Sequence, residues 1–237
     1  SDVPKLPSWK VLDAKPDRKL LPEPMPAAIE APPMLEAVSE PVRAQYSVQD
    51  AMMQNARTKL VMGQTEGGDI VRWDITESPH IRVHGKSQGA GKTNLIRCVA
   101  ASALRVGHHV VVCDRRRFKD WAEFQGKAEL IDVKDPKHFV EVAQRLAAIY
   151  QERDALLGQH GAANISRLPN PPQRIVVVIA EFGALCAQAQ ADGVLEAMLQ
   201  PLTMVMREAG AAGVHVVIED QVVDQRWPRG ISTNAEP

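Results

Sequence analysis

The sequence has few aromatic residues, few cysteines and almost no net charge. Aromatic residues make up only 4% of the chain, so Val, Leu, Ile, Ala and Met must fill its core. The three cysteines (Cys98, Cys113 and Cys186) are far apart and lack metal-ligand spacing, which favours buried, reduced thiols. A net charge of −1 excludes a global basic field. Any contact with nucleic acid would therefore need a local patch or an assembled channel.

Long apolar runs are also missing. No stretch approaches the roughly 20 apolar residues that a membrane-spanning helix needs, and no signal peptide is visible. We therefore expect this chain to be cytoplasmic, which leaves open a membrane anchor elsewhere in a longer protein.

Proline is concentrated at the start of the chain, where nine of the 17 prolines fall within the first 45 residues. Such a composition cannot build a core, so we expect a disordered linker or tail over residues 1–46. This tail is either a simple tether or an arm that docks on a membrane-anchored or accessory partner. Residues 47–79 predict a short helix and then a pair of strands around the turn "TEGG".

From residue 80 onward, apolar strands alternate with helical patterns. The strands "HIRVHG", "HHVVVCD", "RIVVVIAEF" and "VHVVIED" show no polar alternation, which is typical of a parallel sheet with helices on both faces. The fold class is α/β. We expect these strands to end at Gly85, Asp114, Glu181 and Asp220, on the edge that binds ligands. A helix over 194–210 should be kinked or restarted at Pro201.

A glycine-rich loop follows the first of these strands. Small residues let backbone N–H groups surround a phosphate at the start of a helix, while a lysine and a hydroxyl reach the β/γ-phosphates and Mg²⁺. Lys92 and Thr93 supply these last two groups. Lys86 stands where the first glycine of the motif is usual, which weakens the prediction. We expect ATP or ADP to contact Ser87, Gln88, Gly89, Ala90, Gly91, Lys92, Thr93 and Asn94, with Mg²⁺ on Thr93.

The strand "RIVVVIAEF" ends in Ala180-Glu181, where P-loop ATPases have Asp-Glu. Glu181 could activate the attacking water, whereas Ala180 leaves the metal-holding role without a side chain. The alternative for Glu181 is a strand-end carboxylate that faces solvent.

A basic run follows the strand that ends at Asp114. It is either a solvated turn or a patch that contacts DNA phosphates or a neighbouring subunit. Its members are Arg115, Arg116, Arg117 and Lys119.

In this order, the motifs resemble the motor domain of FtsK/SpoIIIE-type DNA translocases, in the FtsK–HerA superfamily of P-loop ATPases. The resemblance runs from about Lys59 to the C-terminus and includes "SPHIRVHGKSQGAGKTNLI", "YQERDALL", "IVVVIAEFGAL" and "AGAAGVHVVIEDQ". It implies a RecA-like ATPase core over 80–237, truncated before the family's last strands. It also implies a homo-hexameric ring that moves along double-stranded DNA without reading its sequence, and a sensor role for Gln221.

Several positions depart from the family pattern. They are Ala180 for Asp, Gly210 for Arg, Glu219-Asp220 for Ala-Thr and Val222-Val223 for Arg-Pro. Either nucleotide turnover is impaired, or Glu219 and Asp220 replace the missing Asp from the adjacent strand. We expect weak binding biased towards ADP, and little turnover. The alternative function is a catalytically degenerate scaffold, as in type VII secretion motors.

Overall fold

The computed structural model describes residues 57–85 and 91–221. The predicted tail over 1–46 and nearly all of the predicted helix over 47–57 lie outside this part of the chain. So do Ser87, Gln88, Gly89 and Ala90 of the glycine-rich loop.

The predicted strand pair is present. β1 (Lys59–Gln64) and β2 (Ile70–Asp74) are antiparallel and are joined by a turn in which Gly68 N–H donates to the Thr65 carbonyl at 3.0 Å. Leu60 and Trp73 are buried, because this small sheet packs against the first helix of the core. A buried hydrogen bond of 2.9 Å from Val61 N–H to Ser102 Oγ attaches it to that helix.

The core contains the predicted parallel sheet. It has five strands in the order β3-β7-β6-β4-β5, all parallel. Their bounds are β3 Ile81–His84, β4 His109–Asp114, β5 Glu129–Asp132, β6 Ile175–Ile179 and β7 Val214–Asp220. Every residue of β4, β6 and β7 is buried, which explains why these strands read as continuous apolar runs.

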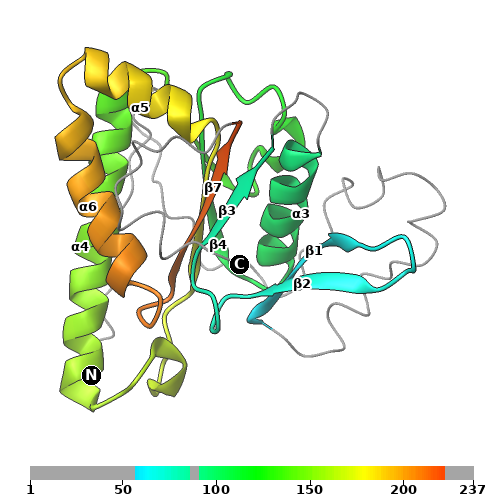
Figure 1. The fold of residues 1–237 in the computed structure, drawn as a ribbon. Coiled ribbons are helices and arrows are strands. Elements are labelled where there is room, and N and C mark those ends of the chain that lie inside the picture. Colours follow the sequence, from blue (N-terminus) through cyan, green and yellow to red (C-terminus); the bar gives the residue numbers. More distant parts are fainter. Residues whose placement is uncertain (1–56, 86–90, 222–237) are drawn as a thin grey trace.

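Helices cover both faces of the sheet, as predicted (Figure 1). α3 (Lys92–Arg105) and the strand pair enclose one core, which includes Ile96 and Val178. α4 (Pro136–His160), α5 (Phe182–Ala191) and α6 (Leu195–Glu208) enclose the other, which includes Phe139 and Leu202. Two short 3₁₀ turns, η2 (Ala122–Phe124) and η3 (Ile165–Arg167), complete the described elements.

Some local features differ from the sequence-based expectation. α6 passes through Pro201 without a restart, because packing of its buried side chains holds the helix together. β3 ends at His84 and β6 at Ile179, slightly earlier than expected, since Ala180 and Glu181 form the turn into α5. No helix in the described part of the chain combines the length and the apolar character that crossing a bilayer requires.

Candidate nucleotide-binding site

The carboxyl ends of β3, β4, β6 and β7 meet the start of α3 at one edge of the sheet (Figure 1). Gly91 precedes α3 with φ +79°, a left-handed conformation that favours glycine. A pocket of about 450 Å³ opens at this edge. Its lining is mostly polar and comprises Gly91, Lys92, Thr93, Asn94, Ile96, Asp114, Arg116, Asp120, Trp121, Ala180, Glu181, Glu219 and Gln221.

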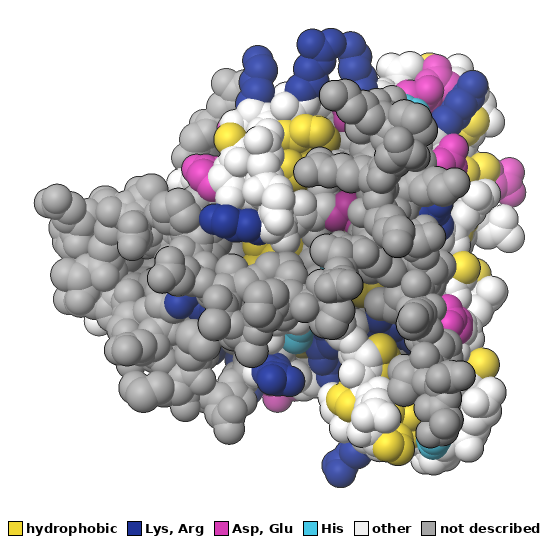
Figure 2. Space-filling model, turned by 180° about the vertical axis from the view of Figure 1, so that it is seen from behind, with side chains coloured by type: hydrophobic (Ala, Val, Ile, Leu, Met, Phe, Trp, Pro, Cys, Tyr) yellow, Lys and Arg dark blue, Asp and Glu magenta, His cyan; other side chains and the backbone are white. Residues whose placement is uncertain are grey.

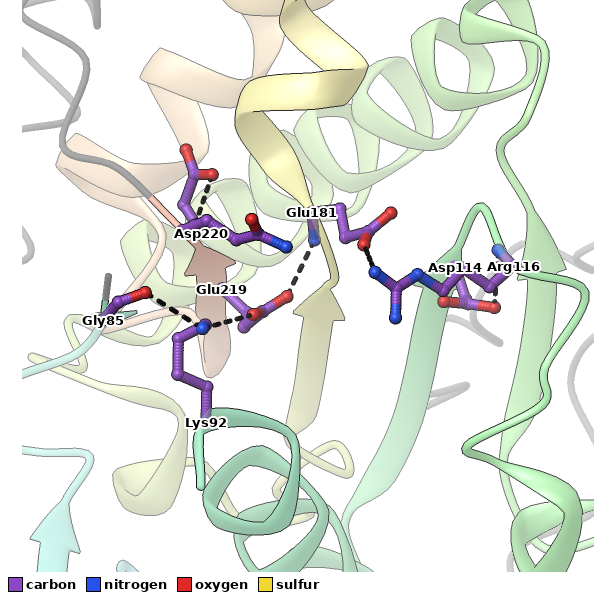
Figure 3. A network of polar contacts seen from close by, with 8 residues as sticks. Gly85, Lys92, Asp114, Arg116, Glu181, Glu219 and Asp220 are labelled. Carbon is purple, nitrogen blue, oxygen red and sulfur yellow. Dashed lines mark hydrogen bonds and ion pairs between the residues drawn. The ribbon is translucent and has the colours of Figure 1, made fainter. Parts of the chain in front are cut away.

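Lys92 is the buried cation of this pocket, with only 9% of its surface exposed. Its Nζ donates to the Gly85 carbonyl at 3.0 Å and lies 4.0 Å from Glu219 Oε1 (Figure 3). The lysine therefore bridges the end of β3 and the end of β7. A bound phosphate would compete for the same ammonium group.

Glu219 lies at the centre of the edge, between β3 and β6. It pairs with Val83 on one side, and the pairing of Ile179 with Ile218 places Ala180 beside it on the other. Glu219 Oε2 accepts the N–H of Glu181 at 3.0 Å. Burial raises the pKa of the Glu219 carboxyl, whereas this N–H and Lys92 act to lower it.

Asp220 has a different environment from Glu219. Its Oδ1 accepts the N–H of Gln221 at 2.7 Å, and its carboxylate packs against Gly183, where an added Cβ would lie 2.5 Å from Oδ2. Figure 3 shows this carboxylate pointing away from Lys92. Only Glu219 of the two acids lines the pocket.

Glu181 begins α5 in a left-handed conformation, with φ 54° and ψ 44°. Its carboxylate forms an ion pair with the Arg116 guanidinium (Figure 3). The geometry therefore brings the candidate general base and one residue of the basic run to the same pocket. While this pair is formed, the Glu181 carboxylate is engaged by a cation.

Asp114 shapes the turn that carries the basic run. Its Oδ2 accepts the N–H groups of Arg116 at 3.0 Å and Phe118 at 2.8 Å. Arg117 and Phe118 both have positive φ, so the chain reverses sharply here. Burial raises the pKa of the Asp114 carboxyl, and the two N–H donors oppose that shift. Asp114 thus holds the turn that presents Arg116 to Glu181.

The rest of the basic run is spread along the same end of the molecule. Arg116, Arg117 and Lys119 are exposed and Arg115 is half-buried. Figure 2 shows Lys and Arg side chains projecting from the upper edge, the end at which β3 and β7 finish in Figure 1. Of the run, only Arg116 lines the pocket.

Asp120 and Trp121 also line the pocket, although the sequence did not predict them there. Trp121 is 1% exposed and packs at an angle of 64° on Phe124, with 5.1 Å between ring centroids. A tryptophan directly after the basic run, in a chain with few aromatics, was the available signal. Gln221 follows β7 and lines the pocket, beside Glu219 on the same strand end.

Gly210 lies at the amino-terminal edge of the sheet, opposite the pocket, between α6 and the start of β7. A Cβ added there would lie 2.6 Å from Cβ of Pro79, which precedes β3. A side chain at this position therefore has no space in the present packing and cannot reach the pocket of its own chain.

Comparison of the sequence with family models and with curated proteins finds no match. Solved structures do match. One is the pCW3 conjugation coupling protein TcpA, in its monomer form with ATPγS, with a TM-score of 0.71, 21% identity and 80% of this chain covered. A second is the cytoplasmic domain of the Thermomonospora curvata type VII secretion ATPase EccC, with a TM-score of 0.60, 21% identity and 88% of this chain covered.

ATPases 2 and 3 of EssC from Geobacillus thermodenitrificans match with a TM-score of 0.58 and 13% identity over 70% of this chain. The present chain spans 55% of the TcpA chain, 26% of the EccC chain and 32% of the EssC chain. At these identities the comparison concerns the fold alone. The chain therefore has the P-loop NTPase α/β fold of these ATPases, in agreement with the fold that the sequence resemblance implied.

Proposed function

We propose that this chain binds ATP and ADP with Mg²⁺ and is the motor domain of an FtsK/SpoIIIE-like double-stranded DNA translocase. The observation that carries the proposal is the pocket that joins Lys92 and Thr93 to Glu181, Glu219 and Gln221. A P-loop lysine and hydroxyl beside strand-end acids are what phosphate binding and phosphoryl transfer require. The motor would serve chromosome segregation, conjugation or mobile-element transfer, and would act in the cytoplasm, where ATP and DNA are found.

Phosphate binding would use the N-terminus of α3. The backbone N–H groups that follow Gly91 have no partner within the helix at its first turn, and the helix dipole favours an anion there. Lys92 would transfer from Glu219 and the Gly85 carbonyl to the phosphates. Thr93 would hold Mg²⁺ through its hydroxyl. Within residues 57–85 and 91–221, no cluster of three His, Cys, Asp or Glu side chains could hold a metal alone, so the nucleotide would supply ligands.

Turnover should be slow. Glu181 pairs with Arg116, so its carboxylate must first be released before it can orient a water. Glu219 places a buried negative charge 4.0 Å from Lys92, close to where the last phosphate would lie. Since ADP has one phosphate fewer than ATP, this charge should favour ADP wherever Mg²⁺ does not balance it. Gln221, at the end of β7, is the candidate sensor of the γ-phosphate.

Contact with DNA would come from the exposed part of the basic run, at the same end as the pocket. We propose that Arg115, Arg116, Arg117 and Lys119 face the DNA backbone or a neighbouring subunit in a homo-hexameric ring. The similar fold of a conjugation coupling protein supports a role in conjugation. We further propose that residues 1–46 are a linker or tail, that 47–79 lead into the motor, and that 80–237 form its core.

A degenerate scaffold module of a secretion system is the second candidate. Type VII secretion ATPases share the fold, and a groove of about 510 Å³ runs along α6 beside Leu195, Leu199 and Met204. A scaffold would bind a peptide in such a groove and would not bind DNA. Salt-dependent DNA binding therefore separates the two candidates.

Equilibrium titration with fluorescent ADP and ATP tests the nucleotide site. The wild-type chain should bind both, ADP more tightly, and Lys92→Ala should weaken binding by about tenfold or more. Equal binding by the two proteins would contradict the proposal.

DNA binding and assembly are tested separately. Affinity for duplex DNA should be independent of sequence, and its logarithm should fall linearly with the logarithm of the salt concentration. Mass photometry with DNA and nucleotide should detect hexamers. Monomers under all conditions would exclude the ring.

A further inference from the structure

We infer that Glu219 is the metal-positioning residue of this ATPase, in the role that Ala180 leaves without a side chain. Its carboxylate would hold the water shell of Mg²⁺ beside Thr93. The inference rests on the proposed nucleotide binding and goes further, because it assigns the metal role to a different strand.

The first support is the position of Glu219 in the sheet. β7 lies between β3, which leads into the glycine-rich loop, and β6, which ends at Ala180. The last pair of this ladder is Ile179 with Ile218, so Ala180 and Glu219 are the residues that directly follow it on the two adjacent chain segments. Compared with the Asp that P-loop ATPases have at the position of Ala180, the carboxylate of Glu219 therefore lies one strand nearer to β3. The longer Glu side chain reaches the same pocket.

The second support is the Lys92–Glu219 contact. Glu219 is only 5% exposed, and a buried carboxylate is costly unless a cation or hydrogen-bond donors accompany it. Lys92 supplies the cation at 4.0 Å. When phosphates attract Lys92, Glu219 keeps the Glu181 N–H but loses its lysine. A divalent cation that arrives with the nucleotide would restore the balance of charge.

The other pocket carboxylates are engaged elsewhere. Glu181 pairs with Arg116, and Asp114 accepts two backbone N–H groups of its own turn. Asp220 packs against Gly183, outside the pocket. Among these acids, Glu219 is the one that contacts the P-loop lysine, which must lie at the phosphates.

The test measures how much Mg²⁺ tightens nucleotide binding, and not turnover. Fluorescent ADP is titrated into the full 237-residue chain, in Mg²⁺ or in EDTA, for the wild type and for Glu219→Gln. Gln keeps the length of the side chain and an acceptor for the Glu181 N–H. Asp220→Asn is the matched control, because it removes the neighbouring charge outside the pocket. Glu219→Gln/Ala180→Asp returns a carboxylate to β6.

We expect Mg²⁺ to tighten binding by about tenfold in the wild type and in Asp220→Asn. The tightening should be lost in Glu219→Gln and regained in Glu219→Gln/Ala180→Asp. Binding in EDTA should persist in Glu219→Gln. An unchanged effect of Mg²⁺ in Glu219→Gln would overturn the inference and leave the nucleotide site standing. If the wild type fails to bind ADP in either buffer, the proposed function fails and the inference with it.

A second variant guards against misfolding of Glu219→Gln. Ala180→Asp alone leaves Glu219 in place. If Glu219 already positions the metal, the effect of Mg²⁺ should change less than about twofold. A large new Mg²⁺ dependence in Ala180→Asp, absent from the wild type, would show that the metal role was empty and would overturn the inference.

Discussion

The amino-terminal and the carboxyl-terminal edges of the parallel sheet, which are the two ends of its strands, both contain buried polar groups. The partners of these groups differ between the two edges. At the amino-terminal edge, Arg153 donates to the carbonyls of Ala212 at 2.8 Å and Gln173 at 2.7 Å. These acceptors are backbone atoms, so the contacts are fixed by the fold. At the carboxyl-terminal edge, the two cations that line the pocket also form ion pairs with side chains, Lys92 with Glu219 and Arg116 with Glu181.

The contacts of Arg153 hold the fold together, whereas those of Lys92 and Arg116 are ones that a ligand can replace. Arg153 is buried and away from the pocket, so it keeps its carbonyl partners while the chain is folded, whereas Lys92 and Arg116 line the pocket and can turn from a carboxylate to a phosphate. We therefore expect substitutions at the amino-terminal edge to reduce stability and leave the nucleotide site intact. Substitutions at the carboxyl-terminal edge should change nucleotide binding or turnover and leave the stability of the fold nearly unchanged.

The largest effect is expected at Arg153, which fastens α4 to the segments before β6 and β7. Burial lowers the pKa of Arg153 to about 10, so the guanidinium is still charged at neutral pH. Arg153→Met would leave buried carbonyls without donors and should cost about 3–5 kcal/mol of unfolding free energy in urea titrations. Lys137→Met, at an exposed position of the same helix, is the control. Equal losses in both variants would contradict the fastening role.

Acid should also weaken the amino-terminal edge. Burial lowers the pKa of His80 and His108 to about 4, from an ordinary value of 6.5, and also lowers the pKa of His215 well below 6.5. The unfolded chain therefore takes up protons between about pH 6.5 and 4 while the folded chain does not. Stability falls as the pH falls through this window, by on the order of 3 kcal/mol for His80. Raised pKa values of the buried acids Asp114, Glu129 and Glu219 act in the opposite direction.

His80→Asn isolates this contribution. Its amide oxygen can accept the Val216 N–H, as the His80 Nδ1 does at 3.1 Å, but it does not titrate. The slope of stability against pH should fall by about one proton relative to the wild type. A slope unaffected by His80→Asn would mean that His80 is protonated in the folded chain.

A smaller effect is expected at Gly210, which packs against the Pro79 ring. Gly210→Ala would place a Cβ 2.6 Å from a rigid proline atom and should cost about 1–3 kcal/mol. Gly158→Ala in α4, where no atom lies within 4 Å, should instead stabilise the chain by up to about 1 kcal/mol. ADP affinity should be unchanged in both. Thermal unfolding measures the change in stability, and ADP titration measures the affinity. A loss of ADP affinity in Gly210→Ala would show that the amino-terminal edge also affects the nucleotide site.

The smallest change in stability is expected at Arg116, whose side chain is 46% exposed in its pair with Glu181. Arg116→Gln should change the unfolding free energy by less than about 1 kcal/mol. It should nevertheless raise ATP turnover measured without DNA, because Glu181 is released, and weaken DNA binding. Arg117→Gln removes the same charge from the same turn and should affect DNA binding alone. Equal turnover in the two variants would show that the Arg116–Glu181 pair does not restrain the base.

Much of the fold could be predicted because its signals are local. Continuous apolar runs predicted β4, β6 and β7, and the glycine before Lys92 predicted the start of α3. β5 was missed because this outermost strand, Glu129–Asp132, is short and mixes acids with apolar residues. α5 was missed because Phe182–Ala191 is rich in Ala and Gln, with little contrast between its faces.

The sequence by itself determined the α/β class, the glycine-rich loop with Lys92 and Thr93, and the lack of a carboxylate at Ala180. These follow from composition and from spacings of a few residues. The resemblance implied that the strand ending at Asp220 is adjacent to the one that leads to Ala180, but only the tertiary structure decided that β7 also pairs with β3 and that Glu219 contacts Lys92. It also decided that Asp220 turns away and that Gly210 lies at the far edge. The physical reason is that strand order brings together residues far apart in the chain, and no local pattern encodes which strands become neighbours.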